Sequence, residues 1–339
     1  MPNSTNKKLI RQLLICAIFV IMLTSIGSCV VLYFTVKAEN QVRYAGIMNL
    51  VSAKVSTTIR SMEVSAMNVF DELGKHMTSP DDVTSALNQK TLLNPDVSGY
   101  FAAFKPDYFP EKGKWFEPYI HQTDSNTKFV LSQVGSASHD YTRSSWYTRA
   151  HEIKESFWSD PYYYYDGTSL SGNYCTFVMP VTDAPGEIAC VCGADMTFTW
   201  ITRELERIDR EVKNDDIRSL YLLDEDDEFY SVILNRDGSC IAHPLEKMLP
   251  IKDADIYDDL KECRAGMGKV MINGSAYTIY YGPVEHVDWS VAIVVPYYNT
   301  LGYYLWPILS VLGIAALSIG ILCIFYRRAK EEKKRFLYV

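Results

Sequence analysis

Residues 174–196 read YCTFVMPVTDAPGEIACVCGADM, and this stretch decides how the middle of the chain folds. Two apolar segments, Tyr174–Val181 and Ile188–Met196, flank the short polar sequence Asp183–Glu187, which contains Pro and Gly. Apolar runs of this length separated by a Pro-Gly turn are typical of paired strands. The stretch therefore predicts a β-hairpin, and a hairpin in turn predicts an antiparallel sheet.

Further elements lie on both sides of this hairpin. Apolar runs bounded by turn residues predict strands at 98–105, 114–122, 230–235, 239–242, 269–272, 276–281 and 289–295, and helical spacing predicts helices at 146–154, 198–212 and 256–263. The second group repeats the order of the first on a smaller scale. The fold class that we predict is α+β, with two stacked antiparallel-sheet units attached to one long helix.

That long helix is predicted directly after the first apolar segment of the chain. Buried-type side chains recur every three or four residues, which is the period of an amphipathic helix. They are Tyr44, Met48, Val51, Val55, Ile59, Met62, Ala66, Val69, Leu73 and Met77. Such a continuous stripe must pack along the outer domain, pair with a second copy of the chain, or do both.

Two segments are long and apolar enough to cross a membrane. Leu13–Val36 has 24 residues and Leu305–Tyr326 has 22, both without a charge, and about 20 residues suffice to span the hydrocarbon core. A cleaved signal peptide is the alternative for the first segment. Its apolar run exceeds the usual length of about 7–15 residues and no A-x-A-like site follows, so we interpret it as a permanent anchor.

The charges that flank the two spans predict their orientation. Lys7, Lys8 and Arg11 precede the first span, and six basic residues within 327–339 follow the second, which places both termini in the cytoplasm. Without those nine basic residues and the two acidic ones of the tail, 24 basic and 39 acidic residues remain, a net charge of −15 on the outer segment. This acidity argues against a nucleic-acid partner.

Several classes of site find no support in the sequence. It contains no Walker A sequence, no H-E-x-x-H and no G-x-S-x-G, so we expect no enzyme, no metal and no cofactor. Cys190 and Cys192 point the same way on a predicted strand, which favours a core role. One disulfide between Cys240 and Cys263, or none, is compatible with the outer cysteines.

Six short motifs resemble those of double Cache (dCache) sensor domains of bacterial transmembrane receptors. In chain order these are Trp146-Tyr147 with Ala150, Trp158-Ser-Asp-Pro161-Tyr162, Pro180-Val181, Gly193-Ala-Asp195, Asp237-Gly238 through His243-Pro244, and Trp289 through Pro296. They span about residues 37–300. The motif sequences are similar to those of sensors attached to sigma-regulator serine phosphatases or to histidine kinases. The resemblance implies two PAS-like Cache units between two transmembrane helices, with a small ligand in the membrane-distal unit.

The resemblance also implies which residues bind that ligand. Carried over by position they are Trp146, Tyr147, Tyr162 and Asp195, where the carboxylate suits an ammonium or hydroxyl group and the rings shield it. The arginine that grips a carboxylate in amino-acid-sensing relatives is replaced by Ser144, with Arg143 one residue earlier as a candidate substitute.

The run Phe157–Gly167, FWSDPYYYYDG, adds further candidates to this site. Alternation along a strand predicts that Tyr162 and Tyr164 face the pocket with Asp166 near its mouth, whereas Tyr163 and Tyr165 lie on an edge surface. An amphipathic edge made of all four tyrosines is the alternative. The ligand classes that remain open are an amine, an amino acid or a carboxylate.

The sequence therefore predicts a two-pass receptor module of the inner membrane that senses a small ligand outside and signals inward. The expected organisation is a cytoplasmic N-terminus (1–12), a span (13–36), a stalk helix (37–76), a distal ligand-binding unit (77–213), a proximal unit (214–298), a second span (305–326) and a basic tail (327–339). A homodimer is expected, and an effector would be a cytoplasmic partner or lie beyond this chain. The rival hypothesis is an anchored adaptor that binds another protein.

Overall fold

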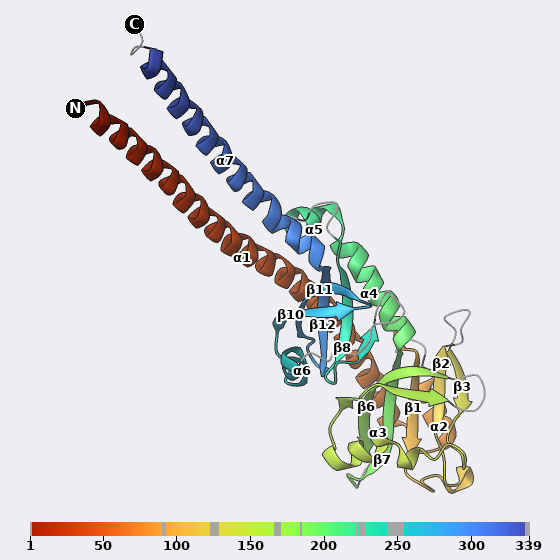
Figure 1. Ribbon diagram of the computed structural model, residues 1–339. Coiled ribbons are helices and arrows are strands. Elements are labelled where there is room, and N and C mark those ends of the chain that lie inside the picture. The colour runs from red at the N-terminus through yellow and green to blue at the C-terminus, as the bar shows by residue number, and fades with distance from the viewer. Residues whose placement is uncertain are drawn as a thin grey trace.

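The fold consists of two antiparallel sheets attached to one very long helix, as predicted (Figure 1). The computed structural model describes residues 2–89, 93–122, 129–165, 171–183, 185–221, 223, 228–242 and 254–335. The first sheet lies at the end of the molecule far from both termini, and the second lies between it and the paired terminal helices. The predicted α+β class and its two-unit arrangement are confirmed.

The elements follow one another in the predicted order. The helices are α1 (Pro2–Lys75), α2 (Pro80–Leu87), α3 (Ser145–Ile153), α4 (Phe198–Val212), α5 (Asp215–Leu220), α6 (Ala254–Lys261) and α7 (Tyr297–Arg335), with short 3-10 turns at Pro110–Lys112 and Tyr141–Arg143. The strands are β1 (Gly99–Phe104), β2 (Pro118–Gln122), β3 (Phe129–Gln133), β4 (Phe157–Trp158), β5 (Tyr162–Tyr165), β6 (Ser171–Thr182), β7 (Ile188–Thr197), β8 (Tyr230–Asn235), β9 (Cys240–Ala242), β10 (Gly266–Ile272), β11 (Ser275–Pro283) and β12 (Trp289–Pro296).

Helix α1 carries the predicted apolar stripe through both units. Every predicted stripe position from Tyr44 to Leu73 is buried, and Met77, just beyond the helix, is partly buried. Asn49, Arg60 and Asn68 on the opposite face are exposed. The stripe packs on both sheets, so a single hydrophobic core runs along the helix from the proximal to the distal unit.

The terminal parts of α1 and α7 run side by side away from the sheets (Figure 1). Both helices contain apolar stretches long enough to cross a membrane, and their side chains there are exposed. Rings of Tyr33 and Tyr304 lie 5.3 Å apart, and the Arg43 guanidinium lies 5.0 Å from the ring centre of Tyr303. These contacts hold the two helices together near the point where they leave the sheets.

The distal sheet is built around the predicted hairpin. Its strand order is β3-β2-β1-β7-β6-β4, with β5 also paired to β6. Alternation along β7 sends Cys190, Cys192, Ala194 and Met196 into the core on the α1 side. The residues between them, including Asp195, therefore face the opposite side of the sheet, where α3 packs.

The proximal sheet has the order β10-β11-β12-β8-β9, with all pairs antiparallel. One face packs against α6 through Ile256 and Leu260, and the other joins the core along α1. Trp158 of the distal unit and Trp289 of the proximal unit meet with ring centres 6.1 Å apart. Both rings line a cavity of about 410 Å³ between the two units.

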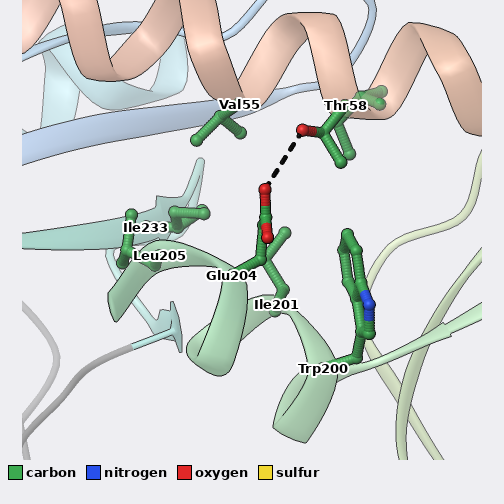
Figure 2. A pocket seen from close by; sticks show the side chains of 8 residues that line it. Val55, Thr58, Trp200, Ile201, Glu204, Leu205 and Ile233 are labelled. Atoms are coloured by element: carbon green, nitrogen blue, oxygen red, sulfur yellow. Dashed lines mark hydrogen bonds between the residues drawn. The ribbon is translucent and has the colours of Figure 1, made fainter. Parts of the chain in front are cut away.

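Helix α4 connects the two sheets and packs on α1. Figure 2 shows its apolar side chains, with Ile201 and Leu205 facing Val55 of α1, and the Thr58 hydroxyl bonded to Glu204 at 3.5 Å. The gap between these side chains measures only about 10 Å³, roughly the space of a single water molecule. This contact is therefore a closed helix–helix interface and not a ligand site.

The structure differs from the sequence prediction at a few elements. The strand predicted at 114–122 begins only at Pro118, because the preceding residues form an irregular segment. Helices α2 and α5 and strand β3 were not predicted: α2 has only eight residues and α5 only six, and the burial pattern of β3 shows no buried residue. Cys240 and Cys263 are both free, so the structure has the arrangement without a disulfide. Asp166 and His243-Pro244 lie outside the described residues.

Candidate ligand-binding site

A cavity of about 320 Å³ opens on the face of the distal sheet that is turned away from α1. Residues of β1, β2, β5, β6, β7, α3 and the segment 134–145 surround it. They are Phe101, Glu117, Tyr119, Val134, His139, Ser144, Ser145, Trp146, Tyr162, Tyr163, Tyr164, Tyr174 and Asp195. Rings and carboxylates dominate this lining, which is a typical composition for a small-molecule pocket.

Asp195 lies at the bottom of this cavity and is held by three hydroxyl groups. Thr176 Oγ1 donates to Oδ1 at 2.6 Å, Tyr119 donates to Oδ2 at 3.1 Å, and Tyr162 lies 3.5 Å from Oδ1. The hairpin register explains the first contact, because Thr176 and Asp195 are directly paired across β6 and β7. The side chain is only 6% exposed.

Burial raises the pKa of Asp195 to about 6, although the hydrogen bonds from Thr176, Tyr119 and Tyr162 act in the opposite direction. Burial and the nearby Asp195 also raise the pKa values of Tyr119 and Tyr162 well above their ordinary range, so both remain hydroxyl donors. Polar groups with strongly shifted pKa values inside one cavity are typical of functional sites.

The two aromatic residues that open α3 take different positions. Trp146 lines the cavity and packs on Phe101 with ring centres 4.8 Å apart. Tyr147 does not line it; its ring packs against Tyr141 and His151, and burial raises its pKa to about 12. The helical turn of about 100° per residue explains this divergence of neighbouring side chains.

The tyrosine run forms strand β5 at the open side of the cavity. Tyr162 and Tyr164 both line the cavity, in the positions expected from alternation. Tyr163 also lines it, but this side chain is 67% exposed and lies at the rim. The ring of Tyr164 meets His139 edge-on at 5.1 Å.

Arg143 does not line the cavity. Its side chain is 87% exposed, and its Nε atom lies 3.6 Å from a carboxylate oxygen of Asp140. The neighbouring Ser144 and Ser145 line the cavity instead. The described part of the lining therefore contains neither arginine nor lysine.

Glu117 is a cavity residue that the sequence analysis missed, because its segment was predicted only as a strand. The side chain is 3% exposed and precedes β2 directly. Burial, together with the nearby charge of Asp195, raises the pKa of Glu117 well above its ordinary value. Glu117 and Tyr119 are two residues apart in the sequence. In an extended segment this spacing puts two side chains on the same face, and it was the one sequence signal that could have placed Glu117 beside Tyr119.

Replacing Gly193 by alanine is expected to destabilise the cavity wall by about 1–3 kcal/mol, because overpacking a dense core costs this much. A Cβ atom at this position would overlap the Phe101 ring and lie 2.8 Å from Thr176 Cγ2. Gly172→Ala is the matched control, since its nearest neighbour is an ordinary 3.4 Å away. Thermal unfolding of both variants measures the difference, and equal melting temperatures would contradict this packing argument.

Comparison with known proteins identifies the type of domain. Residues 83–203 match the family model described as the methyl-accepting chemotaxis protein-like, first PDC sensor domain. This range contains nearly the whole distal sheet and all of the cavity residues named above. The distal unit therefore matches a PDC sensor domain, and the outer segment as a whole has the fold of extracellular sensor domains.

Solved structures of extracellular sensor domains share the fold of this segment. The extracellular domain of the putative histidine kinase mmHK1S-Z3 is 18% identical, with 78% of this chain and 97% of that chain covered and a TM-score of 0.61. The ligand-binding domain of the Pseudomonas fluorescens chemoreceptor CtaA, solved with L-isoleucine, is 13% identical over 79% and 97% of the chains (TM-score 0.54). That of the Pseudomonas aeruginosa PAO1 amino acid chemoreceptor PctB, solved with L-Arg, is 17% identical over 75% and 94% (TM-score 0.51).

A search of curated protein sequences returned no match. The two-sheet segment of this chain lies between two helices with apolar stretches of membrane-spanning length, an arrangement that suggests a two-pass membrane protein. The model that residues 83–203 match is that of a sensor domain. Together these findings describe a sensor-type fold between two helices of membrane-spanning length.

Proposed function

We propose that this protein is a membrane receptor that binds a small organic ligand outside the cytoplasm and transmits the event through α1 and α7. In this proposal both termini are cytoplasmic, residues 77–213 form the ligand-binding unit, and residues 214–298 form the membrane-proximal unit. The basic residues before the first span and after the second support this orientation. The receptor acts as a homodimer, for which the exposed Val64 and Met67 on the outer face of α1 provide apolar surface.

The open cavity at Asp195 is the observation that carries this proposal. A volume of about 320 Å³ lined by rings and by two buried carboxylates suits a small polar molecule. An adaptor for a protein partner would not need this cavity, so its presence favours the receptor over the adaptor. The amino acids bound by two of the structural neighbours also support a small-molecule ligand.

A chain of short contacts leads from the cavity to α1 and to the proximal unit. Thr176, which donates to Asp195, also bonds twice to Ser159: its carbonyl accepts from the Ser159 N–H at 2.8 Å, and its N–H donates to Ser159 Oγ at 3.0 Å. The adjacent Trp158 donates from Nε1 to Glu63 of α1 at 2.9 Å and packs on Trp289. A ligand that shifts Thr176 or Tyr162 would therefore act on the helix that enters the membrane and on β12, which continues into α7.

A thermal-shift screen of the full chain in detergent tests this function. Amino acids, amines, carboxylates and nucleobases are added singly, and the melting temperature is measured. A ligand at 100 times its Kd is expected to stabilise the protein by about 2.7 kcal/mol, which corresponds to a rise of about 5–10 °C. A screen without any hit, or labelling reagents that fail to reach the sheets from outside the cell, would contradict the proposal.

A further inference from the structure

Glu117 differs from Asp195 in how its carboxylate is satisfied. Asp195 accepts hydrogen bonds from Thr176 and Tyr119 and lies within reach of Tyr162. Glu117 is more deeply buried, at 3% exposure, yet its Oε2 atom accepts no hydrogen bond from any group in the described part of the chain. A buried carboxylate oxygen without a donor is costly, and native proteins normally satisfy such groups.

The cavity offers little positive charge to compensate these two carboxylates. The only described lining residue that can become a cation is His139, whose Nε2 atom lies 3.6 Å from Glu117 Oε2, beyond hydrogen-bond distance. Arg143, the candidate for gripping a ligand carboxylate, points into solvent and pairs with Asp140. An anionic group entering this site would face Glu117 and Asp195 with no fixed cation to receive it.

We infer that the cavity is built for an organic amine without a carboxylate group, and that Glu117 is the acceptor which receives its ammonium. This inference rests on the proposed function, because it names the ligand class of the same site. An ammonium has three donors and can bridge Glu117 Oε2 and the remaining acceptor capacity of Asp195. The faces of Trp146 and the tyrosines around it then add cation–π attraction and exclude water.

The alternative is that Glu117 only positions the segment 134–145 through His139. The two roles predict different results for the conservative variants. An acceptor for the ligand requires the negative charge, so Glu117→Gln is expected to lose far more amine affinity than His139→Gln. A purely structural contact between Glu117 and His139 predicts equal losses for both variants.

The experiment uses three compounds that share one side chain and differ in their charged groups: 2-phenylethylamine, L-phenylalanine and 3-phenylpropionate. A second amine, 1,4-diaminobutane, covers ligands without a ring. Binding to the full chain in detergent is measured by calorimetry. The amines are expected to bind, 3-phenylpropionate to show no binding, and Glu117→Gln to weaken amine binding about 10–150-fold, since hydrogen bonds to charged groups contribute this much.

Asp209→Asn is the matched control, because Asp209 is a buried carboxylate outside the cavity that accepts from Ser231. It is expected to leave amine affinity unchanged. Binding of carboxylates or amino acids in place of amines would overturn the inference but leave the receptor function standing. Unchanged amine affinity in Glu117→Gln would overturn the role of this residue. Absence of binding by every class of compound would instead remove the proposed function itself.

Discussion

Asp195→Asn is expected to stabilise the ligand-free protein at pH 7 by about 1–3 kcal/mol and at the same time weaken ligand binding about 100-fold. The ordinary carboxyl pKa of 3.8 rises to about 6 on burial, and this difference corresponds to about 3 kcal/mol at about 1.4 kcal/mol per pKa unit. Because the pKa of Asp195 is higher in the folded protein than in the unfolded chain, a proton bound to Asp195 favours the folded state. This contribution is complete below pH 3.8 and is lost as pH rises through about 6.

The substitution removes this loss of stability. The oxygen of the neutral amide still accepts from Thr176, and its NH2 group can donate to the Tyr119 hydroxyl oxygen. Glu117, whose pKa is raised by burial and by Asp195, adds to the effect in the same direction. The difference in melting temperature between the two proteins should therefore be largest at pH 7, at about 2–10 °C, and should vanish near pH 4. The expected loss of affinity arises because the substitution removes the carboxylate charge of the buried ion pair between Asp195 and the ligand.

Asp209→Asn again serves as control for the binding measurement. Asp209 is buried and its pKa is raised mainly by burial, but it lies on α4, away from the cavity lining. It should alter stability without altering affinity. If Asp195→Asn bound the compounds found by the screen as tightly as the unmodified protein, the assignment of this cavity as the ligand site would be wrong.

Trp289→Ala is expected to lower the free energy of unfolding by about 3–5 kcal/mol, the usual cost of removing a large buried ring. Trp289 is 2% exposed, begins β12 and packs on Trp158 across the boundary between the units. Its loss would enlarge the cavity of about 410 Å³ that both rings line. The two units would then unfold less cooperatively, which calorimetry detects as a broader or split transition.

Met271→Ala provides the comparison, because Met271 lies in the same proximal sheet but is 68% exposed. Surface substitutions of this kind change stability by less than about 0.5 kcal/mol. A Trp289→Ala protein that melts at the same temperature as Met271→Ala would show that the contact between Trp158 and Trp289 does not join the two units energetically.

Periodic features of the sequence predicted most of this fold. The stripe from Tyr44 to Leu73 and the hairpin of residues 174–196 both repeat over many residues, so local errors cancel and burial follows from the pattern. Helices α2 and α5 and strand β3 were missed because each is too short to show a clear period. Helix α2, for example, begins after the N-cap residue Ser79, whose side chain accepts a hydrogen bond from the backbone N–H of Asp82.

The site was harder to predict than the fold, because its residues come from distant segments. Motif positions placed Trp146, Tyr162 and Asp195, and strand alternation placed Tyr164; all four line the cavity, whereas Tyr147 does not. Glu117 was missed because the neighbouring sequence does not distinguish a buried glutamate that faces a cavity from a glutamate that packs in a loop. Arg143 shows the opposite problem, because a shift of one residue at the start of a helix turned its side chain into solvent.

Helix α1 runs without interruption for 74 residues, about 110 Å at 1.5 Å per residue, from the amino terminus to the core beneath the cavity. A rigid helix of this length converts a small change of angle at one end into a larger displacement at the other. A tilt of only about 1° at the end beneath the cavity displaces the amino-terminal end by about 2 Å, so the proposed receptor can work with structural changes too small to disturb its own core.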